Sequence, residues 1–175
     1  MIRNLLAALA VVLGLSWAGA ASAQITVQRS PTSINPALGQ VIRGASATTF
    51  SIATDGTVTR ASGNAIRLSS APVTPVTITI ICQLDILCNL RHVQVTVTIT
   101  GSSGVAQISN LRISSPSGLL YYIAPPSSGT TITFDAYPLG LNLGATFKLG
   151  MDVLVPASGP TGYGTFTYTV TAVLL

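Results

Sequence analysis

The sequence predicts an all-β fold, an antiparallel β-sandwich in one domain. Runs rich in β-branched residues alternate apolar and polar positions with a period of two, as strands do when one face is buried. Connectors rich in glycine, proline and serine separate these runs about every ten to twenty residues. After residue 23 no stretch shows a convincing helical period. Many short strands with regular turn signals are typical of two packed sheets.

The first half of the chain holds the shorter strand candidates, at 25–29, 40–43, 48–53 and 65–69. Between two of them, Asp55-Gly56 is a hairpin turn signal.

The next two runs, 76–81 and 93–99, flank a loop that contains Cys82 and Cys88. The second run alternates strictly, with valine or isoleucine at every other position. Because the runs follow one another across a bounded loop, we expect them to pair as antiparallel neighbours.

Three further strands are expected at 130–136, 147–155 and 165–174, with Gly150 as a candidate bulge in the second. The last run is the clearest strand, because threonine occupies one face and apolar residues the other. Its predicted core residues are Phe166, Tyr168, Val170, Ala172 and Leu174.

The first 23 residues have the pattern of a secretory signal peptide. Arg3 precedes an apolar run over 5–17, and Ala21-Ser22-Ala23 forms a small-residue cleavage site. The alternative, a membrane anchor, is disfavoured because a span needs about 20 apolar residues. We therefore expect cleavage between Ala23 and Gln24, and a mature domain of residues 24–175 with no integral membrane segment.

Charged residues are scarce after this segment. Once Arg3 is removed, seven basic residues and four aspartates remain, and the chain has no glutamate. They are scattered singly, so no basic stripe forms on which phosphates could bind. We expect no nucleic-acid partner.

Cys82 and Cys88 are the two cysteines of the chain. In an exported protein, an even pair so close in sequence is typical of a disulfide. Such a short loop would contribute on the order of 2–3 kcal/mol in the chain-entropy model. A metal site is disfavoured because only His92 lies near, and a redox pair more often has two intervening residues.

Catalytic chemistry is nearly absent. His92 is the only histidine, no Gly-x-Ser-x-Gly motif is present, and the four aspartates are isolated. We predict no enzymatic activity, catalytic residue, metal or cofactor. The aromatic residues leave a ligand platform open as an alternative to simple packing. Because Tyr121 and Tyr122 are adjacent, only one ring can face the core of a strand pair; Tyr137 and Tyr163 lie near turns.

Several short motifs carry a family resemblance. They are 38–41 (Leu-Gly-Gln-Val), 54–59 (Thr-Asp-Gly-Thr-Val-Thr), 143–147 (Leu-Gly-Ala-Thr-Phe), 155–157 (Val-Pro-Ala) and 162–163 (Gly-Tyr), followed by the threonine-rich strand 165–171. This pattern resembles a bacterial family of short exported proteins known only as a domain of unknown function. That family is similar to spore coat protein U and to the pilin-type subunits of chaperone–usher systems. The resemblance implies an immunoglobulin-like sandwich, a surface or envelope role and no catalytic residues.

Two classes of function follow. The first is a pilin- or coat-like structural subunit that assembles by β-strand addition, with like subunits or a periplasmic chaperone as partners. Ile25 and Val27 then mark a candidate assembly strand. The second is a self-contained secreted module that binds a sugar or a protein. In either case we expect the protein in the periplasm, at the cell surface or outside the cell.

Overall fold

The computed structural model describes residues 24–31, 38–83, 91–103, 105–137, 144–159 and 165–175. Their regular structure is entirely strand, which confirms the all-β prediction. The strands are β1 (Gln24–Ser30), β2 (Val41–Ile42), β3 (Thr48–Ile52), β4 (Val58–Ser62), β5 (Ile66–Arg67), β6 (Val76–Gln83), β7 (Val93–Ser103), β8 (Gln107–Ile113), β9 (Leu120–Tyr121), β10 (Thr131–Tyr137), β11 (Ala145–Val155) and β12 (Thr165–Leu174).

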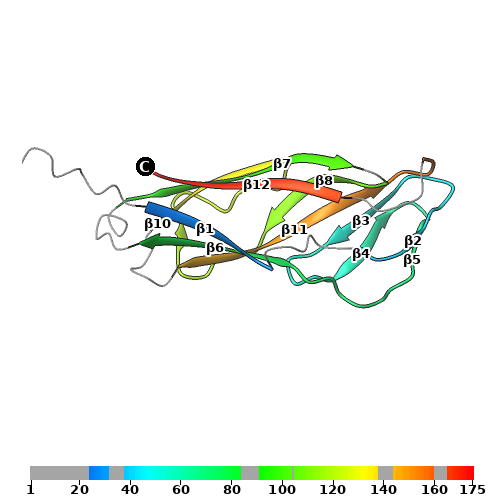
Figure 1. The fold of residues 1–175 in the computed structure, drawn as a ribbon, viewed down its shortest axis with the longest axis horizontal. Helices are drawn as coiled ribbons and strands as arrows, with labels where there is room; N and C mark the ends of the chain where they lie inside the picture. The colour runs from blue at the N-terminus through cyan, green and yellow to red at the C-terminus, as the bar shows by residue number, and fades with distance from the viewer. Residues whose placement is uncertain (1–23, 32–37, 84–90, 104, 138–143, 160–164) are drawn as a thin grey trace, which may run out of the picture.

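The larger sheet is built around β11. One edge of β11 pairs with β6 over 145–149 and then with β3 over 151–155. Its opposite edge pairs with β8. At the sheet's two ends, β1 pairs with β6 and β4 pairs with β3. Every pairing is antiparallel. Because β11 pairs with three other strands, it is the central strand of this sheet and runs along the long axis of the domain (Figure 1).

Gly150 lies where β11 changes its neighbour from β6 to β3. An added Cβ there would lie 2.7 Å from the Ile52 carbonyl oxygen and 2.8 Å from a side-chain carbon of Arg112. The sequence indicated a bulge at this glycine. The register of β11 shifts instead between Asp152 and Val153, against β8. Glycine is needed at position 150 because backbone approaches it closely.

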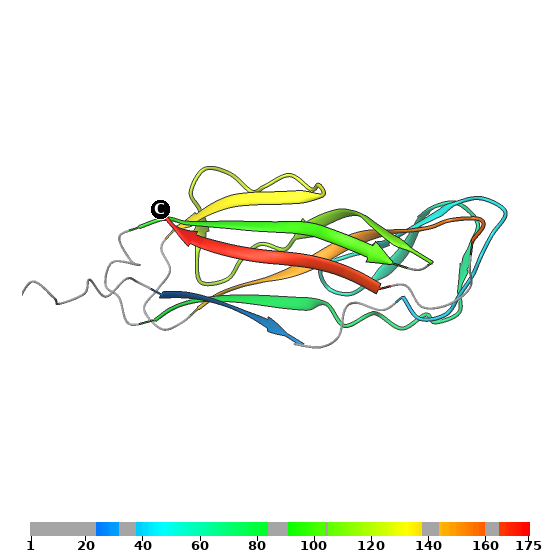
Figure 2. The ribbon, with the colours of Figure 1, turned by 45° about the horizontal axis from the view of Figure 1, so that its top comes forward.

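The smaller sheet has the order β12-β7-β10-β9, again with antiparallel pairs. A separate two-stranded ribbon, β2-β5, lies at one end of the elongated domain (Figure 1). The C-terminus and the start of β7 lie at the other end (Figure 2).

The core lies between the two main sheets. Strands β7 and β10 contribute alternate residues from the smaller sheet, while β6 and β11 contribute theirs from the larger one. Phe134 of β10 meets Phe147 of β11 in a T-shaped contact, with ring centroids 5.6 Å apart. This contact joins the layers through an edge-to-face geometry that aromatic pairs favour.

The predicted pairing of 76–81 with 93–99 is wrong. Strand β6 belongs to the larger sheet, with β1 and β11 as its neighbours, and β7 belongs to the smaller sheet, between β12 and β10. These two strands, consecutive among the described strands, therefore lie in different layers. Each of the two strands has a single apolar face. Such a face is buried equally well when the strands pair within one sheet and when they lie in two sheets that pack across a core, so alternation does not decide between the two arrangements.

Candidate assembly edge

Strand β12 is the edge strand of the smaller sheet. It pairs with β7 along one side, from Thr165 to Leu174, and no described strand pairs with its other side. Such an edge presents backbone N–H and C=O groups on which another strand can pair. The side chains of 165–175 include no charged group that would disfavour this pairing.

Two contacts define which backbone groups of β12 face outward. The Leu175 N–H donates to the His92 carbonyl at 2.8 Å, so Leu175 faces β7. The Tyr168 carbonyl accepts from Arg29 of β1, so Tyr168 faces away from β7. Antiparallel strands alternate these two directions residue by residue. The backbone N–H and C=O groups that point away from β7 are therefore those of Tyr168, Val170, Ala172 and Leu174.

The inner face of β12 is incompletely covered toward its C-terminal end. Phe166 and Tyr168 are buried, whereas Val170, Ala172 and Leu174 are only partly buried against the core. The nearest element across the sheet gap is β1, which lies beside β12 in both ribbon views (Figures 1 and 2). Its residues Ile25 and Val27 are also only partly buried. We call these five partly buried residues the apolar stripe; they are Ile25, Val27, Val170, Ala172 and Leu174.

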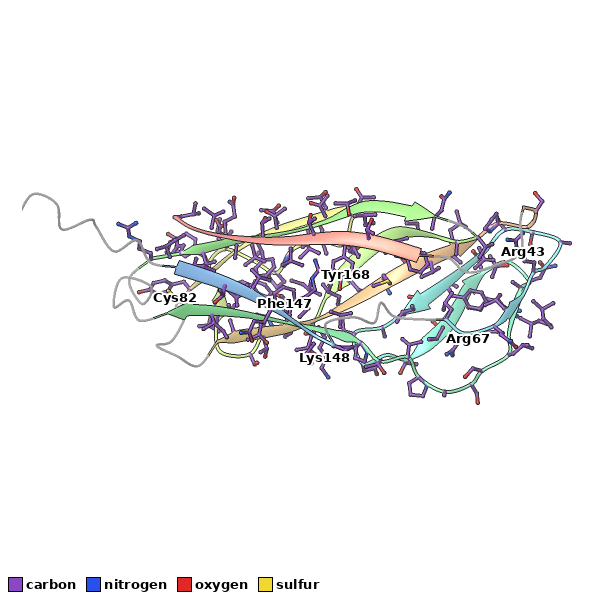
Figure 3. The ribbon with its side chains drawn as sticks, in the orientation of Figure 1. Arg43, Arg67, Cys82, Phe147, Lys148 and Tyr168 are labelled. Carbon is purple, nitrogen blue, oxygen red and sulfur yellow. The ribbon has the colours of Figure 1, made fainter. Side chains whose placement is uncertain are left out.

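Arg29 closes one end of the apolar stripe. Its Nη2 donates to the Tyr168 carbonyl oxygen at 2.9 Å, and its guanidinium carbon lies 4.5 Å from the centre of the Tyr168 ring. Burial raises the pKa of the Tyr168 hydroxyl, and the nearby Arg29 charge opposes that rise. Tyr168 lies in the middle of the domain, so the open part of the edge runs from there to the C-terminus (Figure 3). Sequence reasoning did not identify Arg29, because a lone arginine at the end of a short strand run gives no pattern.

The predicted assembly strand lies in β1. There Ile25 is the partner of Cys82, and Val27 is the partner of Ile80, in the sheet of the same chain. Within a single molecule, this segment thus completes its own sheet. Its use as a donor to another molecule would require it to leave β6, and that role stays a prediction.

Aromatic side chains cluster at the end of the smaller sheet where β7 begins and β10 ends. The ring centroids of His92 and Tyr122 are 3.6 Å apart, and Tyr137 meets His92 edge-on at 5.2 Å. Tyr121 turns inward and packs on Phe134, whereas Tyr122 is exposed, which is the expected division of the adjacent pair. The fourth predicted aromatic residue, Tyr163, lies outside the described residues.

An ion pair spans the outer face of the larger sheet. Arg112 of β8 binds the Asp152 carboxylate of β11, and the Asn110 amide donates to its other oxygen at 3.2 Å. Burial alone raises the pKa of Asp152. The hydrogen bonds from Arg112, Asn110 and Ser51, with the Arg112 charge, outweigh it and leave the pKa lowered. This network fixes β8 on β11 and has no feature of a reactive site.

The remaining predicted sites are only partly within the described structure. Cys82 is buried at the end of β6, and Cys88 lies outside the described residues, so the disulfide stays a prediction. Ala23 and the rest of the signal segment also lie outside them, and Gln24 begins β1. Among the described residues, no group of three His, Cys, Asp or Glu side chains could hold a metal ion. The same part of the chain contains no helix that is long and apolar enough to cross a membrane.

No family model, curated protein or solved structure matches the chain.

Proposed function

We propose that the protein is a non-enzymatic structural subunit of the cell envelope or surface, pilin- or coat-like, that assembles when a strand from a second copy adds to β12. The observation that carries this proposal is the outer edge of β12. At this edge, backbone N–H and C=O groups point away from β7 and apolar side chains are only partly buried. The strand also has no charged side chain that would disfavour pairing with another strand.

The strand order supports an immunoglobulin-like assignment. A constant-type immunoglobulin sandwich has one sheet of strands A, B, E and D and another of C, F and G. Here β1, β6, β11 and β8 follow the first order, and β7 beside β12 follows C beside F. The place of strand G is the outer edge of β12. In this proposal, the added strand takes that place and covers the apolar stripe.

Substitution of Ala172 by proline tests the proposal. The Ala172 N–H points away from β7, so proline removes no hydrogen bond of the existing ladder, and edge strands tolerate it at such positions. It does remove a donor that an added strand would use. Ala172→Val, which keeps the N–H and a small apolar side chain, is the matched control.

We expect Ala172→Val to assemble like the parent chain in sedimentation velocity, and Ala172→Pro to remain monomeric with a similar melting temperature. An Ala172→Pro protein that melts normally and assembles as before would refute strand addition at β12. The alternative function, a self-contained binding module, predicts that the parent chain itself stays monomeric at every concentration.

A further inference from the structure

Strand β12 differs in charge and length from the other edge strands of the two main sheets. Among the described strands, those edges are β1, β4, β8, β9 and β12. An arginine occurs in three of them, at Arg29 in β1, Arg60 in β4 and Arg112 in β8. Strand β9 has only two residues, whereas β12 has ten and no charge. Because charge and short length protect edges from pairing, β12 is the edge strand best suited both to receive a strand and to act as one.

The free hydrogen-bonding groups of β12 limit where a second strand can lie. The N–H and C=O groups of Val170, Ala172 and Leu174 point away from β7 and make no hydrogen bond to the described residues. Tyr168 also faces outward, but its carbonyl accepts from Arg29 at 2.9 Å. The free part of the edge therefore ends at the contact between Arg29 and Tyr168.

We propose that the strand that adds to β12 is β12 of a second copy, in an antiparallel pair around a two-fold axis at Ala172. This inference rests on the proposed function and names the strand that carries it out. The axis pairs Ala172 with its counterpart, and Val170 with Leu174 of the second copy. Outward-facing residues that are paired in this way exchange both N–H···O bonds. Every free group of the edge thus gains a partner, while Arg29 keeps its bond to Tyr168.

Other registers satisfy these groups less well. An axis at Thr171 would place Tyr168 opposite Leu174, so the second copy would compete with Arg29 for the Tyr168 carbonyl. An axis moved one residue the other way would leave Val170 without a partner in residues 165–175. A slip of one strand by a single residue would place outward groups opposite groups that already bond to β7. The hydrogen-bond pattern of the single chain therefore favours the axis at Ala172.

The inner faces of the two strands are compatible in this pair. A two-fold axis perpendicular to the sheet keeps the inner face of each strand on the inner side. Val170, Ala172 and Leu174 of the second copy therefore lie beside the same three residues of the first, which belong to the apolar stripe. The small Ala172 side chains meet at the axis, and each Val170 meets a Leu174. The added strand thus covers partly buried apolar side chains with apolar side chains.

The outer face of β12 is compatible as well. In the same register, Val173 lies beside Thr171 of the second copy, and Leu175 lies beside Thr169. Val173 and Leu175 are 57% and 54% exposed in the single chain. Neighbours directly opposite on antiparallel strands contact each other, so the threonine methyl groups shield both apolar side chains.

The pair joins the smaller sheets of two copies into one continuous sheet. Its strand order is β9-β10-β7-β12, followed by the same strands in reverse. The contact is isologous, so it closes at two copies. Because the C-terminal end of β12 lies at one end of the elongated domain, the copies overlap around 169–175 and extend in opposite directions (Figure 2). We therefore expect an elongated dimer as the unit of assembly.

Cysteines on the outer face of β12 test both the partner and the register. Thr171 and Val173 are exposed, so a cysteine at either position should leave the fold intact. In the proposed pair, residue 171 lies opposite residue 173 of the second copy, with Cα atoms about 4.5 Å apart, which a disulfide can bridge. Two copies of residue 171, or two of residue 173, are diagonal neighbours about 7–8 Å apart, which is beyond ordinary disulfide reach.

The experiment compares single variants with their mixture. Thr171→Cys and Val173→Cys, one of them isotopically labelled, are oxidised alone and as a 1:1 mixture of processed chains, residues 24–175. We expect linked heterodimers to form about tenfold or more faster than either homodimer, because only the unlike cysteines lie opposite each other. The parent chain controls for links through its own cysteines. Thr133→Cys, exposed on the same outer face in β10, controls for random collisions.

The remaining outcomes separate this pair from strand addition in general. Fast linkage of Thr171→Cys alone, or of Val173→Cys alone, would place the axis elsewhere and overturn the register. If no variant links, although the parent chain assembles and Ala172→Pro does not, strand addition stands and the donor is a segment other than β12. If Ala172→Pro assembles like the parent, strand addition at β12 fails and the pair fails with it. A parent chain that is monomeric in sedimentation velocity at about 1 mM contradicts both.

Discussion

Replacement of Arg29 by methionine removes a side-chain link between β1 and β12 while it keeps an unbranched apolar stem. The arginine contributes a hydrogen bond from a charged donor to the Tyr168 carbonyl at 2.9 Å and a cation–π contact at 4.5 Å. A hydrogen bond with a charged partner contributes about 1.5–3 kcal/mol, and an exposed cation–π contact about 0.5–1 kcal/mol. Arg29 is half-exposed, and its ordering costs entropy, so we expect a net loss of about 1–2 kcal/mol.

Thermal unfolding measures this loss. For a domain of about 150 residues, 1 kcal/mol corresponds to about 2–4 °C, so Arg29→Met should lower the melting temperature by about 2–8 °C. Arg91→Met changes the net charge equally. The Arg91 side chain is exposed and makes no hydrogen bond to the described residues, so this control should leave the melting temperature nearly unchanged. Equal effects of the two substitutions would show that Arg29 does not link the sheets.

Three further predictions concern the rest of the chain. Alkylation of the exported protein without prior reduction should label neither Cys82 nor Cys88, and labelling of both would disprove the disulfide. The pKa of Asp152 is lowered from 3.8 in the folded protein, so its stabilising contribution is complete above about pH 4 and is lost as the pH falls through the folded pKa. Asp152→Asn should therefore lower the melting temperature at pH 7 and flatten its fall below pH 4; parallel melting curves of the variant and the parent would refute the role of this carboxylate. The intact mass of exported protein should correspond to a chain that begins at Gln24, and a mass that includes residues 1–23 would contradict cleavage.

The C-terminal strand shows how well a strict pattern predicts structure. Its strand boundaries agree with β12, because five apolar positions with a period of two leave one choice of inner face. The turn at Asp55-Gly56 is also present, with the Thr57 N–H bound to the Asp55 carboxylate at 2.8 Å. It joins β3 to β4, a strand that the sequence did not predict, whereas the predicted run 65–69 contains β5, which pairs with β2. The alternation in β12 and the turn are both local features, so the sequence contains the information that specifies them.

Strand β8 was missed because its pattern is irregular. The register against β11 shifts near Ser109, so the inward positions are Ile108 and Leu111, three residues apart. A search for apolar residues at every second position therefore does not detect this strand. The pairing of 76–81 with 93–99 failed for a different reason, because alternation specifies a buried face but no neighbour. The open edge of β12 and the position of Arg29 depend on sheet order, which is a tertiary property.

Hydrogen exchange along β12 tests strand addition most directly. In the monomer, the amides that face β7 should already be protected and those that face outward should exchange quickly. On assembly, the outward amides should slow by about tenfold or more, because each gains a partner on the added strand. The protected set is Thr169, Thr171 and Val173, and the responding set is Val170, Ala172 and Leu174. Outward amides that exchange in the assembled protein as fast as in the monomer would contradict strand addition at this edge.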